Sequence, residues 1–473
     1  MKHFLIANPG SVNPFPSEKW YKCSLSQHLV LYSEQQLPFM EISGREIWIA
    51  GEIENLKHLK AHFNFLRCGE PLTPFSFIGL LIDYLGTQTA VSFLEGNFCL
   101  IERAGRQLNI FTDSLGKTPV YYSGNTMTCI SSSVKLLSKM SGYEPILKPF
   151  DEFETDKRTE NYSPFRNLER LGPDSYLSIS GESLRTSKKQ SINFLGASVP
   201  NNGSYFVKLL DENIEALTTK ANRIGVPLSG GIDSSTVCAL LKTHHKELYT
   251  YSIGTDARNE FEYSTMVANH LECVNRKKII TEEQVKPLLN NLINYNEIFD
   301  SLALEILLPF EVIYKMAVED GVENLATGYG SDLILGGTLH NVPSPMIHNE
   351  SVALIKRTFW TNEFVNTNAE RYHLDIVHPF WKSGIIKYGL NINADLKIKN
   401  GTEKYIFRKL VSEKAILPES ITWRKKIGIH EGSGMNTLIK SALNTTNQRD
   451  IDYYIYQMYR ELILKPEQIL KTN

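Results

Sequence analysis

The stretch from residue 223 to 244 constrains the fold more than any other part of the chain. The apolar run RIGVPL is followed by SGGIDSS, and a helical pattern then begins in STVCALLKTHH. This order is typical of a buried strand that turns into a helix, as in a parallel α/β sheet. The runs at 247–254 and 324–330 predict two further strands, and the second of these ends in glycines.

The loop SGGIDSS predicts a site for phosphate groups, because ligands of open parallel sheets bind beyond the carboxyl ends of the strands. Gly230 and Gly231 let the backbone approach an anion closely, and the amides of the next helix point toward it. Ser229 and Ser234 add hydroxyl donors. Asp233 would repel a bare phosphate, so we expect it to hold Mg²⁺. The alternative is a plain strand-to-helix turn that the aspartate caps.

The sequence changes character near residue 200. The part before it is rich in β-prone runs, with a hairpin pattern at 97–113, and the part after it alternates strands with helices. The segment 198–204, SVPNNGS, is rich in turn-forming residues and lacks a hydrophobic period. We therefore predict two domains: an α+β sandwich over residues 1–200, and a parallel sheet with helices over residues 204–473.

Composition excludes several classes of function. The net charge of −2 over 473 residues provides no basic excess for binding nucleic acid. No run of about 18 apolar residues is present, so we expect no membrane span. The six cysteines are scattered without a CxxC pair, which favours reduced thiols. The first residues contain no apolar signal region. We expect a cytoplasmic homo-oligomer that acts on a small amino acid, without nucleic acid or membrane partners.

Longer motifs resemble a known family. SGGIDSS resembles the pyrophosphate loop of the N-type ATP pyrophosphatases, and the GxxxxGK[ST] motif of Walker-type proteins is absent from the sequence. The segment 94–122 resembles the glutaminase-type, Ntn-hydrolase-like domain of class B asparagine synthetases. LATGYGSDLILGG and LPESITWRKKIGIHEGSG resemble their synthetase domain. GYGSD and KKIGIHEGSG are most similar to the β-lactam synthetase branch, and within it to carbapenam synthetases.

The first domain departs from the family pattern. A working glutaminase of this type needs a cysteine as its mature N-terminal nucleophile. This chain begins Met1-Lys2-His3, and its first cysteine is Cys23. If that start is native, we expect a degenerate domain without a nucleophile and without ammonia from glutamine. This departure favours an amine within the substrate as the group that attacks.

The resemblance implies an ATP- and Mg²⁺-dependent intramolecular amide ligase. A β-amino acid carboxylate would be adenylated, the molecule's own amine would close a β-lactam ring, and AMP and pyrophosphate would leave. Carboxymethylproline, giving carbapenam-3-carboxylate for carbapenem biosynthesis, is the expected substrate. The alternatives are another amino-acid or peptide substrate, an ammonia-dependent asparagine synthetase, and a scaffold without activity.

The resemblance also assigns the nucleotide and metal residues. Asp233 and Asp332 are expected to bind Mg²⁺. Leu228, Ile253 and Gly328 are expected to line the adenine and ribose pocket. Without the resemblance, Asp332 would be interpreted as a helix cap, and the other three as core and turn residues.

The ring-closing residues are assigned in the same way. Tyr329 and Glu363 are expected to take the proton from the attacking amine, with Glu370 as the alternative acid. An ordinary tyrosine has a pKa of about 10, so Tyr329 would need help from its surroundings to act as a base. Lys426 is expected to face the oxyanion and the leaving phosphate. Lys425, the preceding residue, is the less favoured lysine.

Overall fold

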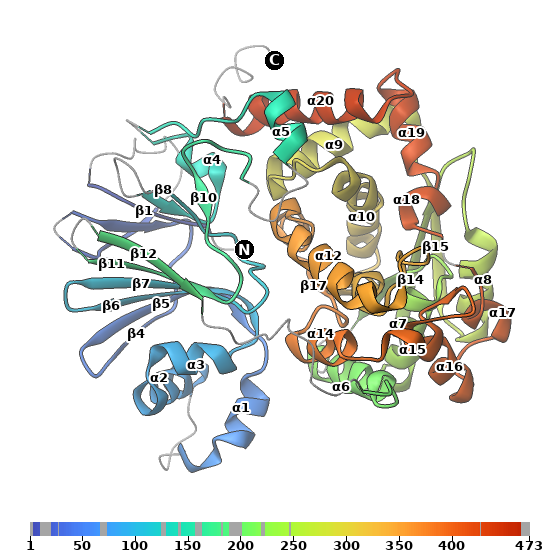
Figure 1. Cartoon of the computed structure of the whole chain (residues 1–473), viewed down its shortest axis with the longest axis horizontal. Helices are drawn as coiled ribbons and strands as arrows, with labels where there is room; N and C mark the ends of the chain where they lie inside the picture. Colours follow the sequence, from blue (N-terminus) through green and yellow to red (C-terminus); the bar gives the residue numbers. More distant parts are fainter. Residues whose placement is uncertain are drawn as a thin grey trace. The chain divides into compact units, whose positions relative to one another are not determined.

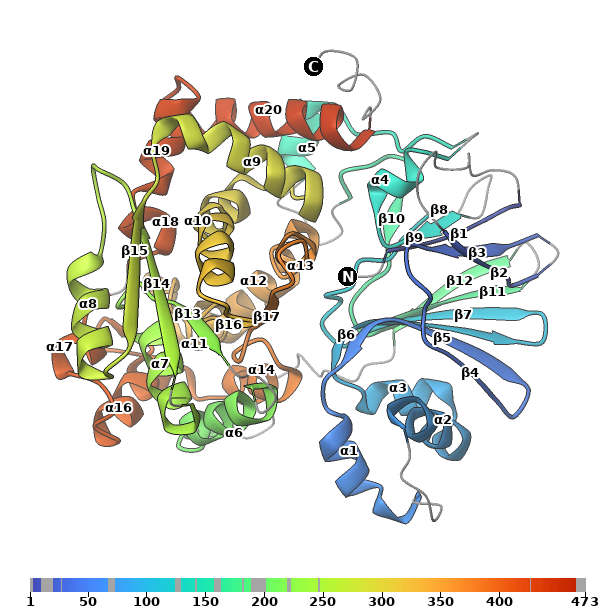
Figure 2. The ribbon, with the colours of Figure 1, turned by 180° about the vertical axis from the view of Figure 1, so that it is seen from behind.

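The structure is a computed structural model, shown from two sides in Figures 1 and 2. It describes residues 3–9, 20–26, 28–66, 73–123, 129–140, 143–156, 163–180, 183–188, 201–218, 223–245, 247–425 and 427–464. Two compact units form: Met1–Ile192 together with Tyr459–Asn473, and Asn193–Met458. The predicted domain bounds stay a prediction, and the described residues Tyr459–Leu464 group with the first unit.

Specific contacts attach Asn201 and Ile463 to their units. Asn201 forms an isolated bridge with Ile392, and its amide donates to the carbonyl of Asn391 at 2.8 Å, so the turn belongs to the second unit. Ser138 Oγ donates to the carbonyl of Ile463 at 2.8 Å, which attaches the end of the described chain to the first unit.

Two antiparallel sheets make up most of the first unit. One has the order β10 (Glu169–Arg170), β8 (Tyr121–Ser123), β9 (Cys129–Ser131), β1 (Phe4–Ala7), β3 (Val30–Ser33) and β2 (Tyr21–Ser24). The other has the order β12 (Ser183–Lys188), β11 (Ser175–Ser180), β7 (Gln107–Thr112), β6 (Gly96–Ala104), β5 (Arg45–Ile53) and β4 (Phe39–Ile42). The predicted hairpin is confirmed, because β6 pairs with β7 in antiparallel register.

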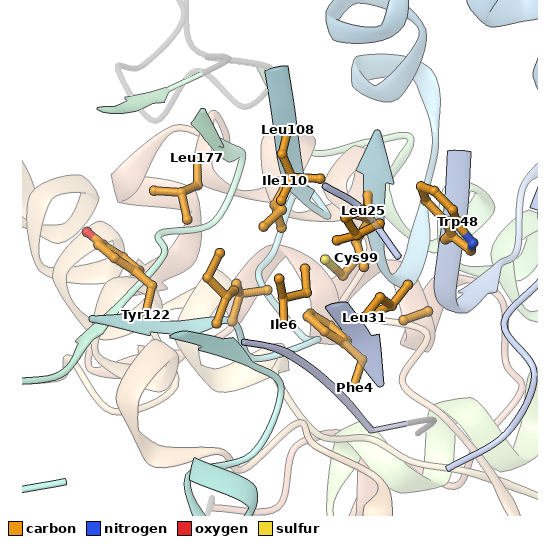
Figure 3. Close-up of a cluster of buried hydrophobic side chains, with 14 of the residues drawn as sticks. Phe4, Ile6, Leu25, Leu31, Trp48, Cys99, Leu108, Ile110, Tyr122 and Leu177 are labelled. Atoms are coloured by element: carbon orange, nitrogen blue, oxygen red, sulfur yellow. The ribbon is translucent and has the colours of Figure 1, made fainter. Parts of the chain in front are cut away.

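Alternation along the strands places the second sheet between two apolar layers. Trp48 and Ala50 of β5 join a core shared with the first sheet, which Figure 3 shows in close-up. Ile47 and Ile49 point to the other face and pack with the helices. Because successive strand residues face opposite sides, one strand serves both layers. The predicted α+β sandwich is thus confirmed.

Short helices complete the first unit. Three of them supply buried residues to the second apolar layer: α2 (Pro74–Leu85), α3 (Thr87–Phe93) and α1 (Leu56–His62), through Leu59. The others are η1 (Asn64–Leu66), α4 (Val134–Leu137), α5 (Phe150–Asp156) and the π-helical turn η3 (Arg460–Leu464).

The second unit is built on a parallel sheet, as predicted. Its order is β15 (Val274–Ile279), β14 (Leu248–Gly254), β13 (Ile224–Pro227), β16 (Asn324–Ala326) and β17 (Asp375–Val377). All four residues of β13, the central strand, are buried. Strands covered on both faces carry continuous apolar runs, which explains why RIGVPL shows no alternation. A small separate ribbon joins β18 (Ile398–Lys399) to β19 (Thr402–Glu403).

Helices cover both faces of the parallel sheet, and Figure 2 shows α8 and α10 on opposite sides of its strands. The helices before β17 are α6 (Phe206–Thr218), α7 (Ile232–His244), α8 (Phe261–His270), α9 (Glu282–Asn296), α10 (Ser301–Glu319), α11 (Ser331–Leu335), α12 (Ile347–Thr361) and α13 (Thr367–Glu370), with the 3₁₀ turn η2 (Ser344–Met346). Those after it are α14 (Ser383–Leu390), α15 (Ala394–Lys397), α16 (Tyr405–Glu413), α17 (Glu419–Thr422), α18 (Ile429–Gly432), α19 (Met435–Ala442) and α20 (Gln448–Tyr459). Of the helices that the described residues form, none is long and apolar enough to cross a bilayer.

The strand order identifies where a ligand would bind. From β13 the chain proceeds outward through β14 and β15, and it then returns to the other side of β13 to form β16 and β17. Ligands of open α/β sheets bind where the strand order reverses in this way. The reversal point lies between β13 and β16, so the loops that follow these two strands lie next to each other.

Candidate active site

A cavity of about 560 Å³ opens at the reversal point of the parallel sheet. All of its lining residues belong to the second unit. They come from the ends of β13, β14 and β16, the first turns of α7 and α11, one side of α10, one side of α12, and the segment 428–433. A volume of this size is ordinary for a pocket that holds small molecules.

Most residues that the sequence analysis assigned to the site line this one cavity. They are Leu228, Ser229, Gly231, Asp233, Ser234, Ile253, Gly328, Tyr329, Asp332 and Glu363. Gly230 is outside the lining, and Lys426 lies outside the described residues. The alternative acid Glu370 is exposed on α13 and is absent from the lining. The roles assigned to all of these residues stay predictions.

The glycine loop extends the sheet before it enters α7. The amide of Leu228 donates to the carbonyl of Tyr251 at 2.8 Å, which prolongs the pairing of β13 with β14. Asp233 then falls in the first turn of α7. The first amides of a helix have no partners within the helix and favour anions. The predicted strand, loop and helix are therefore found in the predicted order.

Gly230 is required for packing rather than for lining the cavity. It has a φ of +73°, and a Cβ atom there would lie 2.4 Å from Cβ of Tyr263 on α8. Arg424 fixes the same turn, since its Nη1 lies 3.3 Å from the carbonyl oxygen of Gly230 and its guanidinium covers the ring of Tyr263. Arg424 also forms an ion pair with Glu260. Arg424, which belongs to LPESITWRKKIGIHEGSG, thus attaches that segment to the SGGIDSS loop.

The two predicted metal carboxylates are joined by a lysine that the sequence analysis missed. Lys404 Nζ lies 2.6 Å from both carboxylate oxygens of Asp233 and 2.7 Å from Oδ1 of Asp332. It also donates to Ser331 Oγ at 3.0 Å. The Lys404 side chain is fully buried. We call these four residues the ionic cluster.

The backbone leaves no spare room beside the ionic cluster. A Cβ atom added to Gly337 would lie 2.0 Å from Asp332 Oδ1 and 2.5 Å from Lys404 Cε. The Lys404 backbone is left-handed, with a φ of 55°. A non-glycine residue pays a conformational cost in this region, which the three ionic contacts of its side chain offset.

The donor set of the ionic cluster fits Mg²⁺. It has two carboxylates with one ammonium between them, and both carboxylates line the cavity. Mg²⁺ is commonly held by one or two carboxylates together with substrate phosphates. The described residues contain no group of three or more His, Cys, Asp or Glu that could hold a metal by themselves. This arrangement therefore suits an ion that arrives with a nucleotide.

A tyrosine and a glutamate meet at another part of the same cavity. The Tyr329 hydroxyl donates to Glu363 Oε2, and Thr361 Oγ1 donates to Glu363 Oε1 at 2.9 Å. The Tyr329 ring stacks on Phe364 with centroids 4.9 Å apart, and Phe364 in turn stacks on Trp381. Tyr329 and Glu363, which follow the end of the glycine loop by 94 and 128 positions, thus line one cavity with it.

Burial sets the protonation of this pair. Desolvation raises the pKa of Glu363 to about 7, although the hydrogen bonds from Tyr329 and Thr361 act in the opposite direction. Desolvation, followed by the negative charge of Glu363, raises the pKa of Tyr329 well above its usual range. Tyr329 therefore stays protonated near neutral pH, and the proton acceptor of the pair is Glu363.

Comparison with known proteins agrees with this site. The family described as asparagine synthase matches residues 206–369 and 366–468, which is more than half of the chain. The matched part contains the parallel sheet and the whole cavity lining. The chain belongs to the asparagine synthase family. Membership supports an ATP-dependent ligase that forms a C–N bond.

Individual relatives differ in what they share with the chain. A carboxyethyl-arginine beta-lactam-synthase of Streptomyces clavuligerus is 30% identical over 237 residues, which cover 50% of this chain and 45% of that protein. A glutamine-hydrolyzing asparagine synthetase of Mus musculus is 25% identical over 452 residues, covering 90% of this chain and 78% of that protein. The second alignment is longer than the second unit and therefore includes part of the first.

Among solved structures, an NH3-dependent NAD synthetase from Campylobacter jejuni is 14% identical. It covers 58% of this chain and 97% of that chain, with a TM-score of 0.26. A TM-score this low supports no argument about the fold.

Proposed function

We propose that the protein is an ATP- and Mg²⁺-dependent ligase that closes a β-lactam ring within one substrate molecule. A substrate carboxylate attacks the α-phosphate of ATP, which gives an acyl-adenylate and pyrophosphate. An amine of the same molecule then attacks the acyl carbon, loses a proton and expels AMP. Carboxymethylproline, which would give carbapenam-3-carboxylate, is the proposed substrate.

One observation carries the proposal: the glycine loop, the ionic cluster and the Tyr329–Glu363 pair line one cavity. An aliphatic amine has a pKa near that of lysine, about 10.4, and is therefore protonated at neutral pH. It must lose that proton before or during its attack. Glu363, a buried carboxylate with a pKa of about 7 in the same cavity as the glycine loop, would accept that proton.

Each part of the cavity has a task in this scheme. The first amides of α7 and the hydroxyls of Ser229 and Ser234 would bind phosphate oxygens. Asp233 and Asp332 would hold Mg²⁺, which supplies charge to the phosphates when it is bound. Glu363 would accept the amine proton, and Tyr329 would orient its carboxylate through their hydrogen bond. Lys426 is proposed, from the family motif alone, to stabilise the oxyanion.

An ammonia-dependent asparagine synthetase is the second candidate, supported by the family and by the relative from Mus musculus. The homologous β-lactam synthase is 30% identical across half of this chain, which supports the first candidate in the same unit. A homo-oligomeric, cytoplasmic enzyme stays a prediction.

Mass spectrometry and AMP release together test the proposal. The protein is incubated with ATP, Mg²⁺ and carboxymethylproline, and a parallel reaction contains aspartate and ammonium. The proposal predicts a product lighter than carboxymethylproline by one water, with equal amounts of AMP and pyrophosphate. AMP formed with aspartate and ammonium only would instead identify an asparagine synthetase. The absence of AMP from both reactions would contradict the proposed chemistry.

A further inference from the structure

A positively charged side chain that the proposed reaction does not use lies in the same cavity. Arg357 lines the cavity from α12, and 54% of its side chain is exposed. Its Nη2 lies 3.6 Å from Oδ2 of Asp300, which is longer than a direct hydrogen bond. Among the residues that the structure describes, this ion pair is the one polar contact that Arg357 makes. A guanidinium carries five N–H donors, so Arg357 has donors left to offer a ligand in the cavity that it lines.

Asp300 is held in place because it is the N-cap residue of α10. Its Oδ1 accepts a hydrogen bond from the amide of Ala303 at 2.9 Å, which caps α10. The aspartate is therefore fixed by the helix and cannot move to saturate the guanidinium. An arginine beside one loosely paired carboxylate can still bind a second carboxylate through two parallel hydrogen bonds.

Apolar side chains from the same two helices also line this cavity. Leu302 and Ile306 lie one turn apart on α10, and Leu354 lies one turn before Arg357 on α12. Leu302 is 41% exposed although it is a large hydrophobic residue. Side chains of this kind at a cavity surface are suited to contact carbon atoms of a ligand.

Arg357 and Glu363 would each bind a different end of a ligand. Both Arg357 and Asp300 are close enough to Glu363 to influence its charge, so the cation and the proton acceptor face one space. A substrate amine placed at Glu363 would leave its remaining carbon frame against Leu302 and Ile306. A negative group beyond that frame would then meet Arg357.

We propose that Arg357 binds a second acid group of the substrate, distinct from the carboxylate that ATP activates, and that Leu302, Ile306 and Leu354 contact the carbon frame between them. This inference rests on the proposed ligase function and deepens it. The substrate class is a β-amino dicarboxylic acid with a compact apolar frame. Aspartate carries two carboxylates as well, but it has no apolar frame for these three side chains.

Two matched acids test the inference: carboxymethylproline and pyrrolidin-2-ylacetic acid, which lacks the ring carboxylate. With the unaltered enzyme, kcat/KM for the diacid should exceed that for the monoacid by about 30- to 100-fold, the effect of a charged hydrogen-bonded pair. Arg357→Met should remove this preference by lowering kcat/KM for the diacid only. Arg357→Lys should retain part of the preference, because it keeps the charge without the fork.

Lys356→Met is the matched control, since it removes the same charge from the neighbouring position of α12, outside the cavity lining. It should leave kcat/KM for both acids within about twofold. Equal losses for both acids in Arg357→Met would mean that Arg357 acts on the protein and would overturn the inference while the ligase function stands. Turnover of aspartate with ammonium, but of neither acid, would overturn both.

Calorimetry distinguishes a failure of the Arg357 inference from a failure of the proposed ligase function. Each acid is titrated into the enzyme in the presence of Mg²⁺ and a non-hydrolysable ATP analogue. Tighter binding of the diacid that Arg357→Met abolishes supports the acid-binding role whatever the turnover. Equal affinity of the two acids for the unaltered enzyme contradicts it.

Discussion

Two ends of one cavity hold their acidic side chains in opposite ways. At one end, Asp233 and Asp332 share a fully buried ammonium within 2.7 Å. At the other, Glu363 accepts hydrogen bonds from two hydroxyl groups, and burial raises its pKa to about 7. Acids of similar intrinsic strength are thus given different tasks by their partners: a fixed negative charge at one end and an exchangeable proton at the other.

The ionic end should be the more sensitive to loss of a partner. Lys404→Met leaves two carboxylates facing each other without the cation between them. We expect the free energy of unfolding to fall by about 3–5 kcal/mol, as for other buried ion pairs that lose one member. Urea denaturation of the purified protein measures this, with ligase activity as a second readout.

A control variant and the effect of Mg²⁺ make this test more specific. Lys409→Met breaks an exposed pair with Glu413 on α16 and should cost at most about 0.5 kcal/mol. Added Mg²⁺ should restore part of the stability of Lys404→Met, because a divalent ion can replace the ammonium. If Mg²⁺ stabilises neither the variant nor the unaltered protein, the two carboxylates do not form a cation site.

At the apolar end, Glu363→Gln should remove the proton acceptor and lower turnover by about 10²- to 10⁴-fold. Because the pKa of Glu363 is about 7, the unaltered enzyme should lose activity as the pH falls below 7, where the carboxyl becomes protonated. This acidic limb should be missing from the variant's pH–rate profile. Glu370→Gln, at an exposed position of α13, is the control and should stay within about twofold. Comparable losses in both variants would contradict the assignment.

The smallest effect concerns the tuning of that pKa. Thr361→Val removes the 2.9 Å hydrogen bond that stabilises the Glu363 carboxylate, so the pKa should rise. We expect the acidic limb to move up by as much as about one pH unit. Thr358→Val is the matched control, because Thr358 lines the cavity but donates to the carbonyl of Ile355. A limb that stays in place for Thr361→Val would show that this hydrogen bond does not tune the acid.

The ligand-binding loops could be predicted from the sequence because their chemistry is local. SGGIDSS and TGYGSD each place their glycines and acids within a few residues of a strand end, and parallel strands bring such ends together. The hairpin of β6 and β7 was likewise predicted from a local pattern of two β-prone runs. The Tyr329–Glu363 contact was reached through the family resemblance, since 34 residues separate them.

Lys404 and Arg357 could not be found in this way. Lys404 lies in the polar stretch NGTEKYIF, which is typical of a surface turn, and only tertiary packing makes it fully buried. Arg357 belongs to a helix whose polar positions suggest a solvent-facing side. The direction of the Tyr329 pKa shift also depends on burial, which the sequence pattern around it does not reveal.

The tight backbone at Gly337 has a consequence for how such an enzyme can acquire a new substrate. No side chain fits there without displacing the acid and the ammonium beside it, so the nucleotide-handling end tolerates little alteration. On α10 and α12, by contrast, Leu302 and Arg357 line the cavity and are exposed. Exchange of a few side chains on those two helices is therefore the open route for redirecting the chemistry to other acids, with the energy-supplying half kept intact.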